Sequence, residues 1–204
     1  MRFRTFFPML PGCAVLVLGF GAQAASLSVS VTDLAGHPVP DAVVMLEPAS
    51  GKLPVKPLPV VEVGQMQRQF NPRVTVITVG TPVGFPNYDT VRHHVYSFSP
   101  IKPFELKLYA GVPSAPLVFD KPGIAVLGCN IHDQMAAWIV VVDTPHYART
   151  SAEGQARLDN ISAGAYKLRA WYAGMGHGED PVSQALTVAA GDMTANMKLP
   201  DAAP

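Results

Sequence analysis

The sequence predicts an all-β protein, and three observations lead to this prediction. The 204 residues include 20 prolines and 17 glycines, which divide the chain into short segments. Leu27, Val29 and Val31 alternate with serines, a period of two that indicates a strand with one buried face. No stretch after residue 24 shows a long helical period. Short strands separated by Gly and Pro turns are typical of a β-sandwich or barrel.

The other strands are expected where runs of valine, isoleucine, leucine and aromatic residues end at turn residues. A second strand is expected at 42–46, and the proline-rich stretch 48–59 separates it from a new block. In this block, strands are expected at 73–79, 83–85, 94–98, 104–109, 117–119, 124–127 and 138–142, with a turn at 80–82. After a turn at 143–145, strands are expected at 155–158, 166–171 and 185–188.

The first 24 residues are organised like a secretory signal peptide. Arg2 and Arg4 form a charged start, an apolar stretch follows, and Ala22-Gln23-Ala24 has the small-x-small pattern of a cleavage site. The apolar stretch is short for a bilayer span, and no later segment approaches the roughly 20 residues that a span needs. We therefore expect a periplasmic protein without a membrane span.

The charge balance argues against two classes of partner. The chain carries 15 basic and 15 acidic residues, and signal cleavage removes Arg2 and Arg4 but no acid, which leaves 13 basic residues. A net charge near −2 provides no electrostatic footprint for nucleic acid or for anionic lipid. We expect no nucleic-acid partner.

The strongest chemical signal is the run from Cys129 to Met135, which reads C-N-I-H-D-Q-M. Cleavage also removes Cys13, so Cys129 is the one thiol left. An unpaired cysteine in an exported protein indicates an intermolecular bond, a reactive thiol, a metal ligand or an inert buried residue. Here a thiol, an imidazole and a thioether lie three residues apart. With an upstream histidine, at His93 or His94, they match the His₂Cys site with a weak axial Met used for one-electron transfer.

Other interpretations of this run are weaker. Residues three apart also share a helix face, where they would simply pack, but both flanks read as strands. Zinc is less suitable because there is a single thiolate, and a dinuclear copper centre would need a second cysteine in the loop. Met175 and His177 are further soft ligands, but they are interpreted as part of a glycine-rich surface loop. No paired carboxylate or nucleophile–base arrangement can be defended, so no enzyme activity is expected.

From about Gln65 to Val142 the chain resembles a cupredoxin. The resemblance is carried by Phe70-Asn71-Pro72, the run 83–89, His93-His94-Val95, the run 119–123 and the Cys129 loop. It implies a Greek-key β-sandwich with one type 1 copper site. The family pattern Asn-x-Asp-x-x-x-His-x-Val places the first ligand at His93, and His94 then takes the usually polar next position.

The implied copper ligands are thus His93, Cys129, His132 and Met135. The short C-x₂-H-x₂-M loop is similar to that of amicyanin-like cupredoxins. The sequence segments around His93 and Cys129 are similar to those of cupredoxin-like proteins labelled methylamine utilization proteins.

The two ends of the chain carry a second resemblance. Residues 31–44 resemble the start of a transthyretin-like, carboxypeptidase-regulatory-type β-sandwich, and residues 150–168 resemble its later strands. Roughly 90 residues lie between the two pieces, about the size of one small domain. The expected organisation is therefore a cupredoxin domain at 55–143 inserted into an outer sandwich built from 25–54 and 144–200. The alternative is one cupredoxin with two decorated ends.

Together these features predict a periplasmic type 1 copper protein that carries single electrons and is not an enzyme. Its partner is expected to be a redox protein such as a dehydrogenase, a peroxidase or a cytochrome. Two alternatives stay open. One is a copper-binding protein for storage or delivery, and the other is a structural interaction module with a degenerate copper site.

Overall fold

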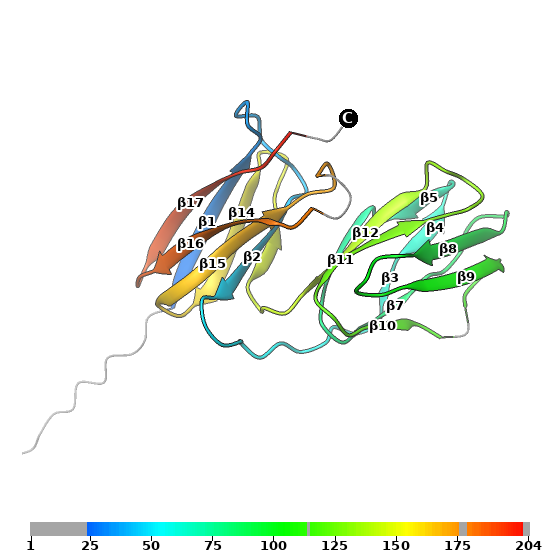
Figure 1. Ribbon diagram of the computed structural model, residues 1–204, viewed down its shortest axis with the longest axis horizontal. Helices are drawn as coiled ribbons and strands as arrows, with labels where there is room; N and C mark the ends of the chain where they lie inside the picture. The colour runs from blue at the N-terminus through cyan, green and yellow to red at the C-terminus, as the bar shows by residue number, and fades with distance from the viewer. Residues whose placement is uncertain (1–23, 114, 176–178, 202–204) are drawn as a thin grey trace, which may run out of the picture.

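The computed structural model describes residues 24–113, 115–175 and 179–201, and within them it holds strands and no helix (Figure 1). The predicted all-β class and β-sandwich architecture are therefore confirmed. The strands are β1 (Ala25–Thr32), β2 (Val43–Pro48), β3 (Val61–Glu62), β4 (Gly64–Met66), β5 (Gln69–Asn71), β6 (Val74–Thr78), β7 (Thr81–Gly84), β8 (His93–Ser97), β9 (Phe104–Tyr109), β10 (Leu117–Phe119), β11 (Gly123–Gly128), β12 (Ala136–Val142), β13 (Tyr147–Arg149), β14 (Gln155–Ile161), β15 (Gly164–Trp171), β16 (Val182–Val188) and β17 (Asp192–Lys198).

Strands from the two ends of the chain, β1, β2 and β13 to β17, form one sandwich, the terminal sandwich. Its sheets have the strand orders β14-β1-β17 and β13-β2-β15-β16. Strand β1 pairs antiparallel with β14 and parallel with β17, so the first and last strands are neighbours. Leu27, Val29 and Val31 are fully buried in the core between the two sheets, as their alternation in the sequence predicts.

The strands between these two groups, β3 to β12, form the central sandwich. A five-stranded sheet, β6-β12-β11-β8-β9, shares its core with the three-stranded sheet β10-β7-β3, and a separate hairpin joins β4 to β5. Val95, Leu127 and Ile139 enter this core from the larger sheet, and Val83 and Phe119 enter it from the smaller one. Cys129 and Met135 belong to the same buried cluster, which places the C-x₂-H-x₂-M loop at one end of this core.

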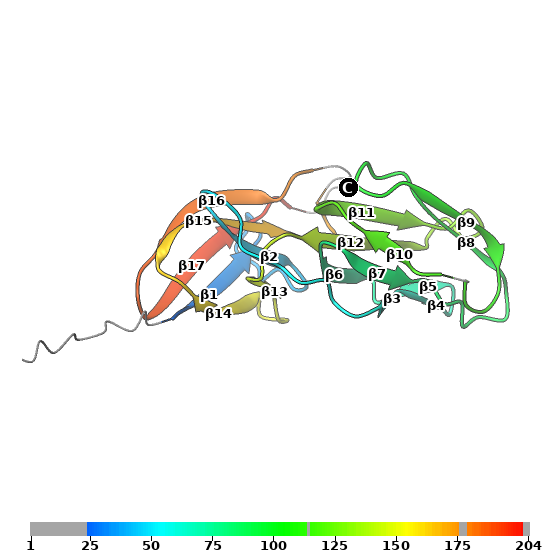
Figure 2. The ribbon, with the colours of Figure 1, turned by 90° about the horizontal axis from the view of Figure 1, so that it is seen from below.

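Strand β12 contributes to both sandwiches (Figure 2). Its odd-numbered residues from Ala137 to Val141 belong to the central core, whereas its even-numbered residues from Trp138 to Val142 pack against Val43 and Trp171 of the terminal sandwich. The ring centroids of Trp138 and Trp171 are 6.4 Å apart. Because both faces of β12 are buried, its sequence is continuously apolar instead of alternating.

The strands expected from the sequence are present with shifts of a few residues at their ends, but several others were not predicted. These are β3, β4, β5, β13 and β17, which are short or rich in polar residues. The turn expected at 80–82 was wrong in part, because Thr81 and Pro82 lie in β7. Strand β3 pairs only with Val83 and Gly84, so Pro82 stands where β7 is paired on one side only, a position that tolerates a proline.

Candidate metal centre

The hairpin of β11 and β12 brings Cys129 and Met135 together. Gly128, the last residue of β11, pairs with Ala136, the first residue of β12. The antiparallel register therefore places Cys129 and Met135 opposite each other, immediately beyond the last pair. The Met135 backbone N–H donates to the His132 carbonyl at 2.9 Å, which folds the loop back on itself. Both sulfur-bearing side chains are buried in the central core.

His93 reaches the same place from β8. It is fully buried, and its Nδ1 lies 3.9 Å from Cys129 Sγ. The rings of His93 and His132 have centroids 5.1 Å apart. One ligand atom from each of His93, Cys129 and His132 lies within 4.8 Å of the other two, which leaves room for a single metal ion.

The donor atoms in this cluster fit copper. Nδ1 of His132 is buried and has no hydrogen-bond partner among the described residues. An unpaired buried nitrogen costs about 1–3 kcal/mol, and a metal ion at this point would satisfy it. One thiolate, two imidazoles and a neighbouring thioether are the soft, mixed donors that suit copper in both of its common oxidation states. Zinc structural sites, by contrast, usually have more thiolates or a full set of four strong ligands.

A carboxylate fixes the orientation of the His93 ring. Nε2 of His93 lies 2.8 Å from Oδ2 of Asp89, so the N–H of the ring is held on Nε2 and donates to Asp89. The Nδ1 lone pair is then directed toward Cys129. Neutral imidazole with its second nitrogen bound to a carboxylate is a common arrangement behind metal-binding histidines.

Asp89 is itself held by a turn from another part of the chain. The backbone N–H of Gln67 donates to its Oδ1 at 2.7 Å, and the backbone N–H of Arg68 donates to its Oδ2 at 2.9 Å. Gln67 and Arg68 form the two-residue turn between β4 and β5, with φ values of 55° and 57°. Positive φ at both positions belongs to the turn type that matches the twist of a hairpin.

These contacts keep Asp89 ionised. Burial acts to raise the pKa of its carboxyl group, but the Arg68 N–H, the His93 ring and the Gln67 N–H outweigh burial and lower it below the usual value. At neutral pH Asp89 is therefore a carboxylate that accepts from His93. This role of Asp89 was not predicted from the sequence, although the residue lies in the pattern that located His93.

His94 lies on the other face of β8 and does not point toward Cys129. It is buried, its Nδ1 accepts from the Asn130 amide at 2.8 Å, and its Nε2 lies 2.9 Å from Glu105 Oε1. The contact with Glu105 lacks the geometry of a hydrogen bond, so Nε2 has no hydrogen-bond partner among the described residues. His94 thus ties β8 to the residue that follows Cys129, while His93 faces the thiol.

An aromatic side chain covers the backbone next to the thiol. Tyr96 is paired with Gly128, and a Cβ atom at Gly128 would lie 2.5 Å from the Tyr96 ring. The Tyr96 ring is also 4.9 Å, centroid to centroid, from that of Phe98, which is 81% exposed. Only glycine at position 128 lets the ring lie this close to the strand that ends in Cys129.

Tyr109 closes another side of the site. It is paired with His93, its hydroxyl donates to the Phe85 carbonyl at 2.6 Å, and it accepts from the Gln65 amide at 2.6 Å. Burial raises the pKa of Tyr109 to about 12, helped by the Cys129 charge and opposed by the Gln65 hydrogen bond. The phenol therefore keeps its proton near the cluster.

Met175 is not part of this cluster. Met175 is buried with Trp138 and Trp171 between the sandwiches, which differs from the exposed loop that was expected, and His177 lies outside the described residues.

Comparisons with known proteins found similar solved structures. No family model and no curated protein matches the sequence. A copper-containing nitrite reductase from Thermus scotoductus SA-01 is 28% identical over 56% of this chain and 28% of its own, with a TM-score of 0.39. An amicyanin variant in its reduced Cu(I) form is 16% identical over 48% of this chain and 98% of its own, with a TM-score of 0.38. A purple cupredoxin from Nitrosopumilus maritimus is 20% identical over 41% of this chain and 98% of its own, with a TM-score of 0.35.

The matched region spans little more than a quarter of the nitrite reductase chain. With TM-scores below 0.5, these likenesses add nothing to what the side chains at Cys129 show of the site. Within the part of the chain that the structure describes, no helix is long and apolar enough to cross a membrane.

Proposed function

We propose that the protein is a periplasmic type 1 copper protein that carries single electrons between redox partners and catalyses no bond-making reaction. The observation that carries this proposal is the buried, unpartnered Nδ1 of His132 beside Cys129 and His93. In this proposal His93, Cys129 and His132 would hold copper as strong ligands, and Met135 would be a weak one. When bound, copper supplies a one-electron couple.

The residues around the ligands favour fast electron transfer because they hold the donors still. Cys129 and Met135 continue a paired β-hairpin, and the Asp89 carboxylate fixes the His93 ring. The Asn130 amide, bonded to His94, anchors the ligand loop to β8. A donor set that does not rearrange between oxidation states adds little to the barrier for moving an electron.

The ligand loop also provides a route by which the electron reaches a redox partner. Ile131, beside His132, is 48% exposed, and His132 itself is partly exposed. A redox protein such as a dehydrogenase, a peroxidase or a cytochrome would dock here through a small interface, as transient electron-transfer complexes do. This proposal includes export by residues 1–24, which lie almost entirely outside the described residues.

We further propose that the chain has two domains, the cupredoxin-like domain at 55–143 and an outer domain made of 25–54 and 144–200. The strand pairing of β1 with β17 and the separate cores of the two sandwiches support this division. The transthyretin-like identity of the outer part and the methylamine utilization label remain parts of the proposal.

The test is a titration of the metal-free protein with Cu(II), followed by visible absorption and EPR. We expect an intense blue thiolate-to-copper band and a narrow copper hyperfine splitting, both lost in Cys129→Ala. The adjacent histidines provide a matched pair, because His93→Gln should abolish the blue band and His94→Gln should keep it. A pale spectrum that does not respond to Cys129→Ala would contradict the type 1 assignment and favour a copper carrier or a structural module.

A further inference from the structure

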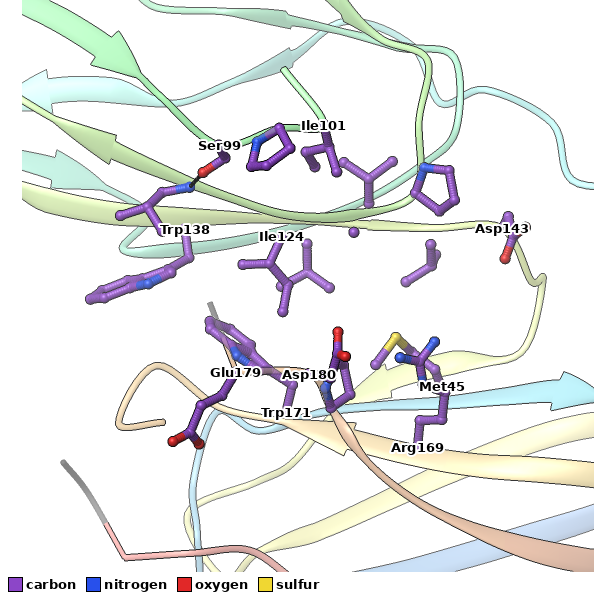
Figure 3. A pocket seen from close by; sticks show the side chains of 18 of the residues that line it. Met45, Ser99, Ile101, Ile124, Trp138, Asp143, Arg169, Trp171, Glu179 and Asp180 are labelled. Carbon is purple, nitrogen blue, oxygen red and sulfur yellow. Dashed lines mark hydrogen bonds between the residues drawn. The ribbon is translucent and has the colours of Figure 1, made fainter. Parts of the chain in front are cut away.

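A cleft of about 600 Å³ lies between the two sandwiches (Figure 3), and no residue of the loop from Cys129 to Met135 lines it. Its upper wall comes from β11 and β12 of the central sandwich, and its lower wall comes from β2 and β15 of the terminal sandwich. The same sheets pack together around Trp138 and Trp171, so the cleft opens where they part. Its volume is in the range of small-molecule sites, which often form between domains.

The walls of the cleft are mostly apolar. Ile124 and Val140 line the upper wall, and Met45 lines the lower one. Trp138 and Trp171 lie at one end, with their rings tilted by 54° to each other. These are the two tryptophans of the chain. Such a surface suits the apolar body of a ligand. The Arg73 guanidinium, 5.1 Å from the Trp138 ring centroid, already covers one face of that indole.

Four carboxylates and one guanidinium also line the cleft, and two of the carboxylates are already neutralised. Glu47 pairs with Arg169 at 3.0 Å, and Asp143 pairs with Lys52 at 2.7 Å. The other two carboxylates, of residues 179 and 180, form no ion pair with any described residue. The side chains that line the cleft therefore carry more negative than positive charge.

The two unpaired carboxylates are not equivalent. Figure 3 shows the Asp180 carboxylate pointing up toward the strands of the central sandwich, whereas the Glu179 carboxylate points away from them. Asp180 thus places one negative charge beside the apolar walls of the cleft. Glu179 provides a neighbouring charge of the same kind that does not face the cleft.

We propose that this cleft binds a small organic ammonium ion with an aromatic or branched aliphatic body. The body is buried against Ile124, Met45 and the two indoles, and the ammonium group pairs with Asp180. A neutral molecule of the same shape lacks the ion pair, and an anion is repelled by the carboxylates. This site is separate from the proposed copper site and does not depend on it.

The two tryptophans make the cleft directly observable, because the whole indole emission of the chain comes from its lining. We would titrate the purified protein with 2-phenylethylammonium and follow tryptophan fluorescence. A saturable change is expected. 2-Phenylethanol, which has the same body without the charge, and the ammonium ion, which has no body, should each bind at least about fivefold more weakly.

Asp180→Asn and Glu179→Gln form the decisive pair of variants, since each removes one negative charge from neighbouring exposed positions. Asp180→Asn should weaken binding about fivefold, and Glu179→Gln should leave it unchanged. Equal binding of the amine and the alcohol, equal effects of the two variants, or no saturable change would each overturn the proposal. Circular dichroism of both variants checks that the fold is retained.

Discussion

Oδ2 of Asp89 lies 2.8 Å from Nε2 of His93, and through this one contact a carboxylate outside the ligand set decides which imidazole nitrogen faces Cys129. The contact is built by a turn whose two backbone N–H groups hold the same carboxylate. The position of the His93 ring therefore depends on a hairpin that lies more than 20 residues earlier in the chain.

Replacing Asp89 should weaken metal binding without unfolding the protein. In Asp89→Ala the His93 ring loses the acceptor of its N–H, so we expect copper affinity to fall about 10- to 100-fold. Competition with a chelator of known affinity measures the change. Asp133→Asn is the matched control, because Asp133 is an exposed acid within the ligand loop and should have no comparable effect. Equal losses in the two variants would point to net charge instead of the Asp89–His93 contact.

A methyl group at position 128 should destabilise the protein. The added Cβ of Gly128→Ala would lie 2.5 Å from the Tyr96 ring, so this ring, which packs against Phe98, has to shift. We expect the free energy of unfolding to fall by about 1–3 kcal/mol, as for other overpacked sites. Urea denaturation measures this.

The same substitution in a Tyr96→Leu background should cost clearly less, because the clashing ring is gone. An equal cost in both backgrounds would show that the strain comes from the backbone of β11 and not from Tyr96.

Shortening a buried side chain in the core of the terminal sandwich should leave the metal centre intact. Leu168 is fully buried in the core of the terminal sandwich, so Leu168→Ala should lower the free energy of unfolding by about 2–5 kcal/mol. If the two sandwiches are separate domains, the visible spectrum of the copper-loaded protein below the unfolding transition should not change. A shifted spectrum in folded Leu168→Ala would mean that the site depends on the terminal core. Ile139→Ala, in the central core, is the contrasting variant.

Acidification should destabilise the protein in part through His146. Burial lowers the pKa of His146, with a hydrogen bond to the Asp159 backbone acting in the opposite direction. The folded pKa is thus below the unfolded value of about 6.5, so the unfolded chain takes up the proton first. The stability contributed by neutral His146 is complete above that value and is lost as the pH falls through and below it.

The measurement is urea unfolding of the metal-free protein at several pH values between about 7.5 and 5. His146→Gln should show a shallower loss of stability on acidification than the unaltered chain. Identical slopes for the two proteins would show that protonation of His146 is not linked to unfolding.

The local features of this structure could be predicted from the sequence. Leu27, Val29 and Val31 reveal their strand because one face is buried, and the run from Cys129 to Met135 shows its donors at a regular spacing between two apolar segments. The register of β11 and β12 then follows from the length of the loop.

The parts that escaped prediction depend on contacts between distant segments. The Gln67–Arg68 turn contains no glycine or asparagine, so its positive φ values leave no signal in the sequence. Its contact with Asp89 joins loops that no local pattern connects. The cleft, likewise, exists only because two sheets pack at one end and separate at the other.

The pattern of β12 limits how this region of the protein can change. A slip of one residue along the strand would turn Trp138 into the tightly filled interior beside Cys129 and move Ala137 out to meet Trp171, leaving a clash on one side and a void on the other. Insertions and deletions between Cys129 and Met135 must therefore be absorbed within those few loop residues, because the strand that follows has no free face to give up.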